Sequence, residues 1–133
     1  MTTTGDPASS LPAERTLVLV VDDEPALLET MRLWLEEEFE VAVAGSAAAA
    51  EKLMAARRFA VVVCDHMLPG EAGLDFLVRM RERYPETRRI LLTGYINPEL
   101  FSRSYVVGEL SACLLKPVNH AELAVAVRAA AQR

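Results

Sequence analysis

The sequence predicts an α/β domain in which a single parallel sheet is covered by helices on both faces. Its short apolar runs, rich in Val, Ile and Leu, lack the alternation of a sheet with one wet face, so we expect strands buried on both sides. Segments with the apolar spacing of helices lie between these runs. Strands and helices that alternate in this way are typical of βαβ units. The runs span 16–21, 59–64, 88–95 and 111–117.

The composition is that of one ordinary globular domain. A chain of 133 residues is long enough to bury a substantial core. Hydrophobic residues make up 52% of it and charged residues 25%. The net charge of -5 and the lack of a stripe of Lys and Arg argue against a nucleic-acid surface. The arginine pairs at 57–58 and 88–89 are interpreted as solvated helix ends or strand entries.

Residues 1–14 are rich in Thr, Ser, Pro and Gly, which predicts a disordered tail before a domain at 15–133. No apolar stretch approaches the length that spans a bilayer, and no signal peptide is recognisable, so we expect no membrane association and a cytoplasmic protein. Cys64 and Cys113 lie in apolar runs without metal-like spacing. We therefore expect both cysteines to be reduced thiols in the core.

The first strand, 16–21, ends in Asp22, Asp23 and Glu24. Pro25 follows and suits the first turn of a helix, which has one apolar face. That face is formed by Leu27, Leu28, Met31, Trp34 and Leu35.

Val41 and Val43 indicate a second, shorter strand. Ser46 is a suitable N-cap, and the alanine-rich segment 47–57 has a high helix propensity. The run 59–64 then forms a third strand. It ends in Asp65, and a turn with Pro and Gly separates it from a third helix, which stops before Pro85. The apolar positions of this helix are Leu74, Leu77 and Met80.

The last two strands are each followed by a helix with an Asn at its N-cap. The strands end at Thr93 and Lys116, and the N-caps are Asn97 and Asn119. The helices are predicted over 98–107 and 120–131.

Five consecutive β-α pairs predict a doubly wound (βα)5 sheet, because right-handed crossovers place helices on both faces. The flavodoxin-like three-layer sandwich with strand order 2-1-3-4-5 fits five strands. Ligands bind such sheets outside the carboxyl ends of the strands.

Polar residues end four of the predicted strands, and all these ends lie at the same edge of a parallel sheet. Asp22 and Asp23 end the first strand, Asp65 the third, Thr93 the fourth and Lys116 the fifth. Each residue alone has an ordinary explanation as a cap, a turn former or a surface group. Together, two acidic strand ends, a hydroxyl and a lysine predict a functional site.

The chemistry of this set points to phosphoryl transfer. Two carboxylates about 4 Å apart repel by roughly 4 kcal/mol at an effective dielectric near 20, so three acids need a cation or a proton. Oxygen ligands suit Mg²⁺. The ammonium of Lys116 and the hydroxyl of Thr93 suit phosphoryl oxygens. We therefore expect Asp65 to act as a nucleophile and to become an acyl phosphate.

Residues 15–131 resemble the receiver domain of bacterial two-component response regulators. The matching motifs, in family order, are VVDDEP, VVVCDHMLPGEAG, LLTGY and LLKP. The resemblance implies that Asp65 is the phosphoacceptor, and that Mg²⁺ is held by this carboxylate, by Asp23 directly, by Asp22 through a water, and by the carbonyl of Met67. It also implies a switch hydroxyl and a phosphate-contacting lysine, with a cis peptide bond after that lysine. These residues are Thr93 and Lys116.

The sequence departs from the family at two places. Cys113 stands where the family usually has Tyr or Phe as the partner of the switch hydroxyl. Our hypothesis is that the signal instead passes through backbone shifts after Thr93, with Tyr95 or Tyr105 as substitutes. Met67 and Tyr95 are bulky and cannot act as bases at the mouth of the site, which predicts a long-lived phosphoryl group. His66 is expected to be an exposed loop imidazole.

The resemblance implies a sensor histidine kinase or a phosphotransfer protein as phosphodonor, and an output through protein contacts or a homodimer at 94–118. The chain would catalyse only its own phosphorylation and dephosphorylation. A phosphatase of the haloacid-dehalogenase type needs an acid two residues after its nucleophile, where this chain has Met67. A phosphate-independent interaction module remains an alternative, as does a receiver that is a fragment of a longer effector protein.

Overall fold

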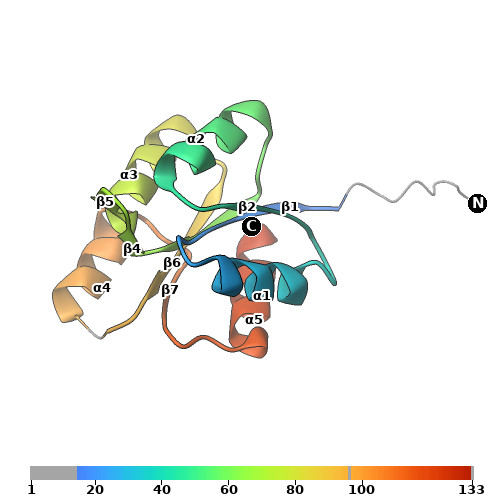
Figure 1. Ribbon diagram of the computed structural model, residues 1–133. Coiled ribbons are helices and arrows are strands. Elements are labelled where there is room, and N and C mark those ends of the chain that lie inside the picture. The colour runs from blue at the N-terminus through green and yellow to red at the C-terminus, as the bar shows by residue number, and fades with distance from the viewer. Residues whose placement is uncertain (1–14, 96, 133) are drawn as a thin grey trace, which may run out of the picture.

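A computed structural model describes residues 15–95 and 97–132 of the chain, so the tail predicted at 1–14 lies outside the described residues. Five strands form one parallel sheet in the order β2-β1-β3-β6-β7 (Figure 1). Because β6 and β7 are the fourth and fifth strands of this sheet along the chain, the predicted order 2-1-3-4-5 is confirmed. The strands are β1 (Leu17–Val21), β2 (Glu40–Ala44), β3 (Val61–Asp65), β6 (Arg88–Thr93) and β7 (Ala112–Leu115).

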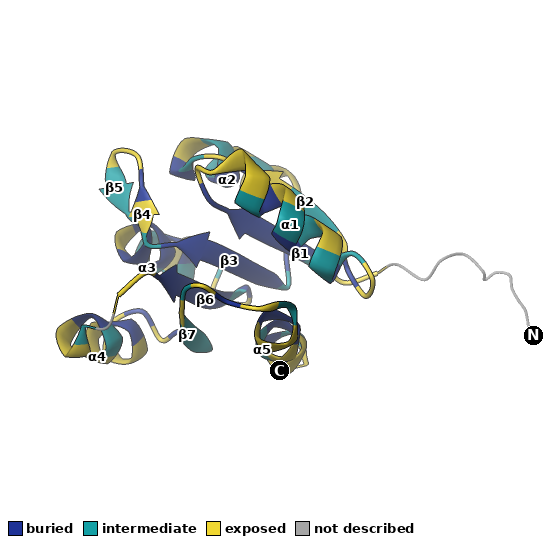
Figure 2. Cartoon of the chain, turned by 60° about the horizontal axis from the view of Figure 1, so that its bottom comes forward, coloured by how far each residue is buried: buried dark blue, intermediate teal, exposed yellow. Residues whose placement is uncertain are grey.

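Helices cover both faces of the sheet and enclose two separate apolar cores. One core lies between the sheet and α1 and α5, and the other lies between the sheet and α2, α3 and α4. Figure 2 shows the buried strands between helices whose outer faces are exposed. The predicted three layers are therefore present. The helices are α1 (Pro25–Leu35), α2 (Ala47–Ala56), α3 (Gly73–Arg83), α4 (Pro98–Val106) and α5 (His120–Ala131).

Capping residues place the helices as the sequence predicts. The side chains of Ser46, Asn97 and Asn119 accept hydrogen bonds from the first-turn amides of α2, α4 and α5. Proline occupies the first position of α1 and α4, where a missing N–H costs nothing. None of the helices between residues 15 and 132 combines the length and hydropathy that crossing a bilayer requires.

A short hairpin between β3 and α3 was not predicted. It pairs β4 (Met67–Leu68) with β5 (Glu71–Ala72) in antiparallel register, and Gly70 between them has a φ of 86°. Two residue pairs are too few to produce a periodic signal in the sequence. The hairpin places Met67 directly beside the end of β3.

Two predictions about burial in the strands of the sheet were wrong. Cys113 is only half-buried, because it lies in β7 at the edge of the sheet, although both cysteines are free as expected. Arg89 was expected to be solvated at a strand entry, but it is 4% exposed. Its side chain lies on the face of the sheet that α3 and α4 cover. There its guanidinium donates to the backbone carbonyls of Gly108, Thr87 and Glu109.

Gly73 brings the start of α3 against the end of β3. A Cβ at this position would lie 2.1 Å from the carbonyl oxygen of Asp65, closer than any real contact. The amide of Gly73 donates to the carbonyl of His66 at 2.7 Å. The missing side chain is therefore what allows the loop after Asp65 to fold back onto the strand end.

We predict that Gly73→Ala lowers the free energy of unfolding by about 2 kcal/mol or more, because backbone rather than a flexible side chain must move. Urea unfolding measures the change. Gly45→Ala is the control, since a Cβ there meets nothing within 4 Å, and its effect should stay within about 0.5 kcal/mol. Equal stability of the two variants would contradict the close packing of Gly73.

Candidate functional site

The register of the sheet brings the predicted residues to one edge. Val21 is paired with Cys64, so the residues that follow them, Asp22 and Asp65, lie at the same level on neighbouring strands. On the other side of β3, Thr93 is paired with Leu115, the residue before Lys116. The amide of Lys116 donates to the carbonyl of Thr93 at 2.7 Å and thus extends this pairing.

Lys116 joins two buried carboxylates of different strands. Its Nζ lies 3.0 Å from Oδ1 of Asp65 and 3.3 Å from Oδ2 of Asp22. The two aspartates are 4% and 1% exposed. Oδ1 of Asp22 also accepts from the amide of Glu24 at 2.9 Å, which fixes this carboxylate. The peptide bond between Lys116 and Pro117 is cis, as the resemblance implied.

Asp23 lies beside the two carboxylates that Lys116 contacts, so one ammonium faces three negative charges. Oxygens of Asp22, Asp23 and Asp65 lie within 4.8 Å of one another, and Asp23 is exposed while the other two are buried. Three carboxylates and one ammonium leave two negative charges. An all-oxygen donor set with one open side and this residual charge suits a hard divalent cation such as Mg²⁺.

The electrostatics of the site are set by burial and by Lys116. Burial raises the pKa of Asp65, and the charge of Asp22 adds to this rise, whereas the hydrogen bond and charge of Lys116 act in the opposite direction without cancelling it. Burial lowers the pKa of Lys116, but its two carboxylate partners outweigh burial, so this pKa is raised. The lysine therefore remains charged, and Asp65 gains from any further positive charge nearby.

Thr93 and Met67 complete the neighbourhood of Asp65 in different ways. The Thr93 side chain is fully buried, and its hydroxyl donates to the carbonyl of Tyr95 in a long hydrogen bond of 3.4 Å. The Met67 side chain is 64% exposed, while its backbone amide donates to the carboxylate of Asp65. Both predicted residues thus lie at the site, Thr93 turned toward its own loop.

His66 differs from its prediction as an exposed imidazole. It is partly buried, and its Nδ1 accepts from the amide of Leu74 at 3.4 Å. The N-cap residue of α3 is Ala72, which has no side chain that can accept a hydrogen bond. His66 therefore supplies an acceptor for the first turn of that helix. Burial lowers its pKa, which favours the neutral form that can accept. In the sequence, this capping role of His66 is indicated merely by a helix that begins with a glycine soon after the end of β3.

Cys113 contacts Tyr105, one of the two tyrosines proposed to substitute for the missing aromatic residue at position 113. The hydroxyl of Tyr105 in α4 accepts from the amide of Cys113 at 3.0 Å. The side chain of Ser104 forms a hydrogen bond with the Cys113 thiol. α4 is thus connected to the edge strand through two consecutive residues.

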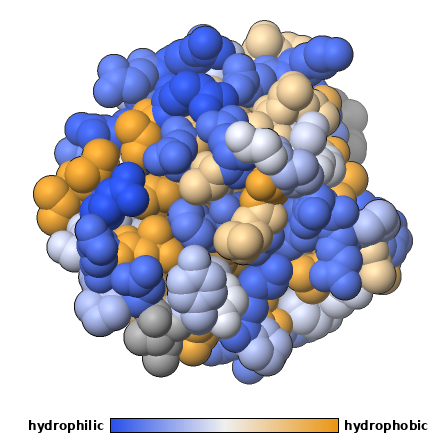
Figure 3. Space-filling view, turned by 60° about the vertical axis from the view of Figure 1, so that its left-hand side comes forward, coloured by the Kyte–Doolittle hydropathy of each residue, from blue (hydrophilic) through white to orange (hydrophobic). Residues whose placement is uncertain are grey.

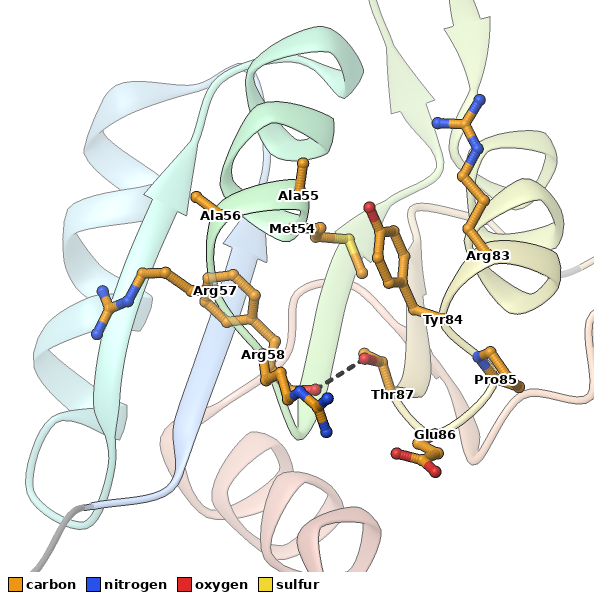
Figure 4. A pocket seen from close by; sticks show the side chains of 11 residues that line it. Met54, Ala55, Ala56, Arg57, Arg58, Arg83, Tyr84, Pro85, Glu86 and Thr87 are labelled. Carbon is orange, nitrogen blue, oxygen red and sulfur yellow. Dashed lines mark hydrogen bonds between the residues drawn. The ribbon is translucent and has the colours of Figure 1, made fainter.

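A pocket of about 570 Å³ lies at the opposite edge of the sheet (Figure 4). It opens between the ends of α2 and α3, where the hydroxyl of Thr87 donates to the carbonyl of Phe59. Two of its rim arginines, Arg57 and Arg83, form ion pairs with glutamates outside it. None of the predicted site residues lines this pocket, so it is separate from the acidic cluster.

Comparison with known proteins agrees with this geometry. Residues 18–128 match the response regulator receiver domain family. The hydrogenase transcriptional regulatory protein HoxA of Bradyrhizobium diazoefficiens is 35% identical over 115 residues, which are 86% of this chain and 24% of that protein. This chain therefore spans about a quarter of the length of that relative.

Two solved receiver domains superpose on nearly the whole chain. The signal receiver domain of an HD domain-containing protein from Pseudomonas fluorescens Pf-5 has a TM-score of 0.83 and 31% identity, covering 90% of this chain and 89% of that one. A CheY-like receiver domain from Methanospirillum hungatei JF-1 has a TM-score of 0.83 and 28% identity, covering 89% and 94%. The chain therefore belongs to the response regulator receiver domain family, the signalling modules of two-component systems.

Proposed function

We propose that this chain accepts a phosphoryl group on Asp65 from the phosphohistidine of a sensor histidine kinase or a phosphotransfer protein. The observation that carries the proposal is the ammonium of Lys116, held between the carboxylates of Asp65 and Asp22 in an acidic cluster with two residual negative charges. Since sensor histidine kinases use ATP, we propose a cytoplasmic location for this transfer.

The donor set fits Mg²⁺. Oxygens around one octahedral Mg²⁺, each about 2.1 Å from the ion, lie at most about 4.2 Å apart. In this cluster one oxygen of each carboxylate lies within 4.8 Å of the other two, so the three groups are close enough to share one ion, directly or through a water. We assign Asp23 and Asp65 as direct ligands, Asp22 as the water-bridged one and the Met67 carbonyl as a further ligand. The ion would supply the positive charge that the cluster lacks and neutralise phosphoryl oxygens.

The residues of the chain divide the transfer between them. A carboxylate oxygen of Asp65 attacks phosphorus, a P–O bond forms, and the P–N bond to the donor imidazole breaks, which leaves that histidine free. Lys116 then exchanges its contact with the carboxylate for one with a phosphoryl oxygen. Because the carboxylate of Asp65 and the ammonium of Lys116 are already in contact, these two groups are preorganised for the step. The chain in this way promotes only its own phosphorylation and dephosphorylation.

Output follows from Thr93 and the surface beyond it. When the Thr93 hydroxyl turns to a phosphoryl oxygen, it releases the carbonyl of Tyr95 and shifts an existing equilibrium of the following segment.

The α4 and β7 surface exposes a set of large apolar side chains, and Figure 3 shows apolar patches on the side of the molecule that carries α4. The set is Tyr95, Tyr105, Val106, Val107 and Leu115. We propose the region 94–118 as the contact face for a protein partner or a second copy.

One alternative has support from a specific residue. Cys113 lacks the aromatic ring that usually accompanies the switch hydroxyl in this family, so the fold could serve as an interaction module that ignores phosphate. The complete set of acids, hydroxyl and lysine favours the phosphorylated receiver instead. A haloacid-dehalogenase type phosphatase is not supported, since the exposed thioether of Met67 stands where that chemistry needs an acid.

The proposal predicts that acetyl phosphate with Mg²⁺ adds one phosphoryl group to the wild-type chain and none to Asp65→Asn. Intact mass spectrometry measures the adduct. Asp75→Asn, which changes an exposed acid of α3, is the control and should be modified like the wild type. An adduct on Asp65→Asn, or none on a Mg²⁺-bound wild type, would contradict the assignment and favour the phosphate-independent module.

We expect millimolar Mg²⁺ to raise the melting temperature of the wild type, because a ligand that binds only the folded state stabilises it. Asp23→Asn removes a direct ligand, so it should lose most of this rise, whereas Asp75→Asn should keep it. Differential scanning fluorimetry with and without EDTA provides the readout. A Mg²⁺ response in Asp23→Asn equal to that of the wild type would exclude Asp23 as a ligand.

The phosphoryl group should be long-lived, since the exposed side chains of Met67 and Tyr95 can neither activate nor orient an attacking water. Met67→Asn and Tyr95→Glu add polar groups at these positions and should each shorten the half-life of the phosphorylated protein severalfold. Loss of the adduct with time, followed by intact mass, measures the half-life. If neither variant decays faster, both residues are packing residues without a kinetic role.

A further inference from the structure

α4 is held unequally at its two ends. Of its residues, Leu100 and Ser104 are the buried ones, so apolar packing fixes it weakly. Its amino end follows a segment in which Gly94 and Tyr95 are exposed. Among the described residues, the hydrogen bond that ties this segment to the site is the one of 3.4 Å from Thr93 to the Tyr95 carbonyl. This end is held by that long hydrogen bond and by the buried side chain of Leu100, without the ion pair and arginine hydrogen bonds found at the other end.

Three consecutive carbonyls at the other end are held by two arginines. Arg81 of α3 donates from Nη1 to the carbonyl of Val107 at 2.8 Å. Arg89 of β6 donates from Nε to Gly108 at 3.3 Å and from Nη2 to Glu109 at 3.2 Å. An ion pair of 3.0 Å joins Arg81 to the carboxylate of Glu109. The carboxyl end of α4 thus has specific contacts to two other elements.

Arg89 is an unusual residue to find in this role. It is 4% exposed, and its remaining Nη1 donates to the carbonyl of Thr87 at 2.6 Å. Among the described residues, its guanidinium forms no ion pair, and burial lowers its pKa. A buried cation bonded only to carbonyls is costly unless its geometry is kept, so displacing the loop would leave both partners unsatisfied.

The backbone after α4 is also tightly constrained. Glu109 has a φ of 48°, in the left-handed region. A Cβ on Gly108 would lie 2.9 Å from the Ser104 carbonyl and 3.1 Å from Cδ1 of Leu74. The amide of Leu110 donates back to the carbonyl of Ser104. This turn has one close-packed arrangement, which the two arginines stabilise.

One strand connects the site to this anchor. Arg89 and Thr93 are four residues apart in β6, so their side chains leave the same face of the sheet. Thr93 contacts Tyr95 before α4, and Arg89 contacts the turn after it. A rigid translation of α4 would break three hydrogen bonds and an ion pair at the anchor. A pivot keeps these contacts, breaks the long bond at the other end and repacks the side chain of Leu100.

We propose that Arg89, assisted by Arg81, is the positioning residue that fixes the carboxyl end of α4, so that phosphorylation swings the amino end of the helix about this anchor. This inference rests on the proposed function, because phosphorylation of Asp65 supplies the driving change. The contact between Tyr105 and Cys113 lies in the anchored half and is kept. The partner surface therefore changes mainly around Tyr95 and the first turn of α4.

Arg89→Lys and Arg88→Lys form a matched pair that tests the anchor. Both change one arginine of β6 to lysine, but Arg88 projects to the other face and its Nε has no hydrogen-bond partner among the described residues. Lysine keeps the charge and loses the planar fork. Amide hydrogen exchange is measured for 98–102 and for 107–111, before and after treatment with acetyl phosphate and Mg²⁺. The core strand β3 reports any loss of global stability.

In the wild type, phosphorylation should change exchange at 98–102 and leave 107–111 unchanged. Without phosphorylation, Arg89→Lys should raise exchange at 107–111 about tenfold, with Arg88→Lys unchanged. After phosphorylation, the altered region in Arg89→Lys should extend through 107–111. A purely structural role would accelerate exchange without changing where the response to phosphorylation ends.

Equal responses of 98–102 and 107–111 in the phosphorylated wild type would overturn the pivot, as would identical behaviour of Arg89→Lys and Arg88→Lys. Arg81→Gln, a change at the surface, provides a second test if Arg89→Lys does not fold, and it should also raise exchange at 107–111. Failure of the wild type to gain a phosphoryl group would instead refute the proposed function, while the comparison of the unphosphorylated variants still decides whether the anchor exists.

Discussion

The contact of one lysine with two buried carboxylates is the constraint on which the site depends. Lys116 comes from the end of β7, Asp65 from β3 and Asp22 from β1, so their meeting requires the strand order and register of the whole sheet. Two buried carboxylates beside the exposed Asp23 would repel strongly without it. The lysine lowers this repulsion but leaves two negative charges. The same arrangement therefore limits the repulsion in the fold and leaves negative charge that a divalent cation could neutralise.

The structure around this contact divides into parts that are fixed and one part that is not. Asp22 is held by the amide of Glu24, and the loop after Asp65 is held by the close approach of Gly73. Arg89 holds the turn after α4. Among the described residues from Gly94 to the first turn of α4, the contacts are the long hydrogen bond from Thr93 to Tyr95 and the packing of Leu100, with no arginine holding the backbone. The parts around Asp65 are therefore constrained unequally, and the described residues between β6 and α4 are held by the fewest hydrogen bonds.

The sequence predicts much of this because parallel strands share one edge. Acids, a hydroxyl and a lysine at the ends of apolar runs are enough to predict that they meet. The strand order came from the five β-α pairs, because 2-1-3-4-5 is the common doubly wound order that fits five strands. Features that depend on exact three-dimensional fit escape such reasoning. The buried position of Arg89 is one such feature. Its partners are backbone carbonyls, which every residue has, so the sequence does not mark them. The β4-β5 hairpin and the capping of α3 by His66 are others, because each consists of only one or two pairs of contacts.

The direct test of the central claim is a crystal structure of the chain with Mg²⁺ and beryllofluoride, a mimic of the phosphoryl group. We predict beryllofluoride bound through its beryllium to the carboxylate of Asp65. Lys116 Nζ and the Thr93 hydroxyl should contact its fluorine atoms, and Mg²⁺ should be held by oxygens of the acidic cluster. An electron density map in which Asp65 remains unmodified and bound to Lys116, at saturating concentrations of both reagents, would contradict the account of this site.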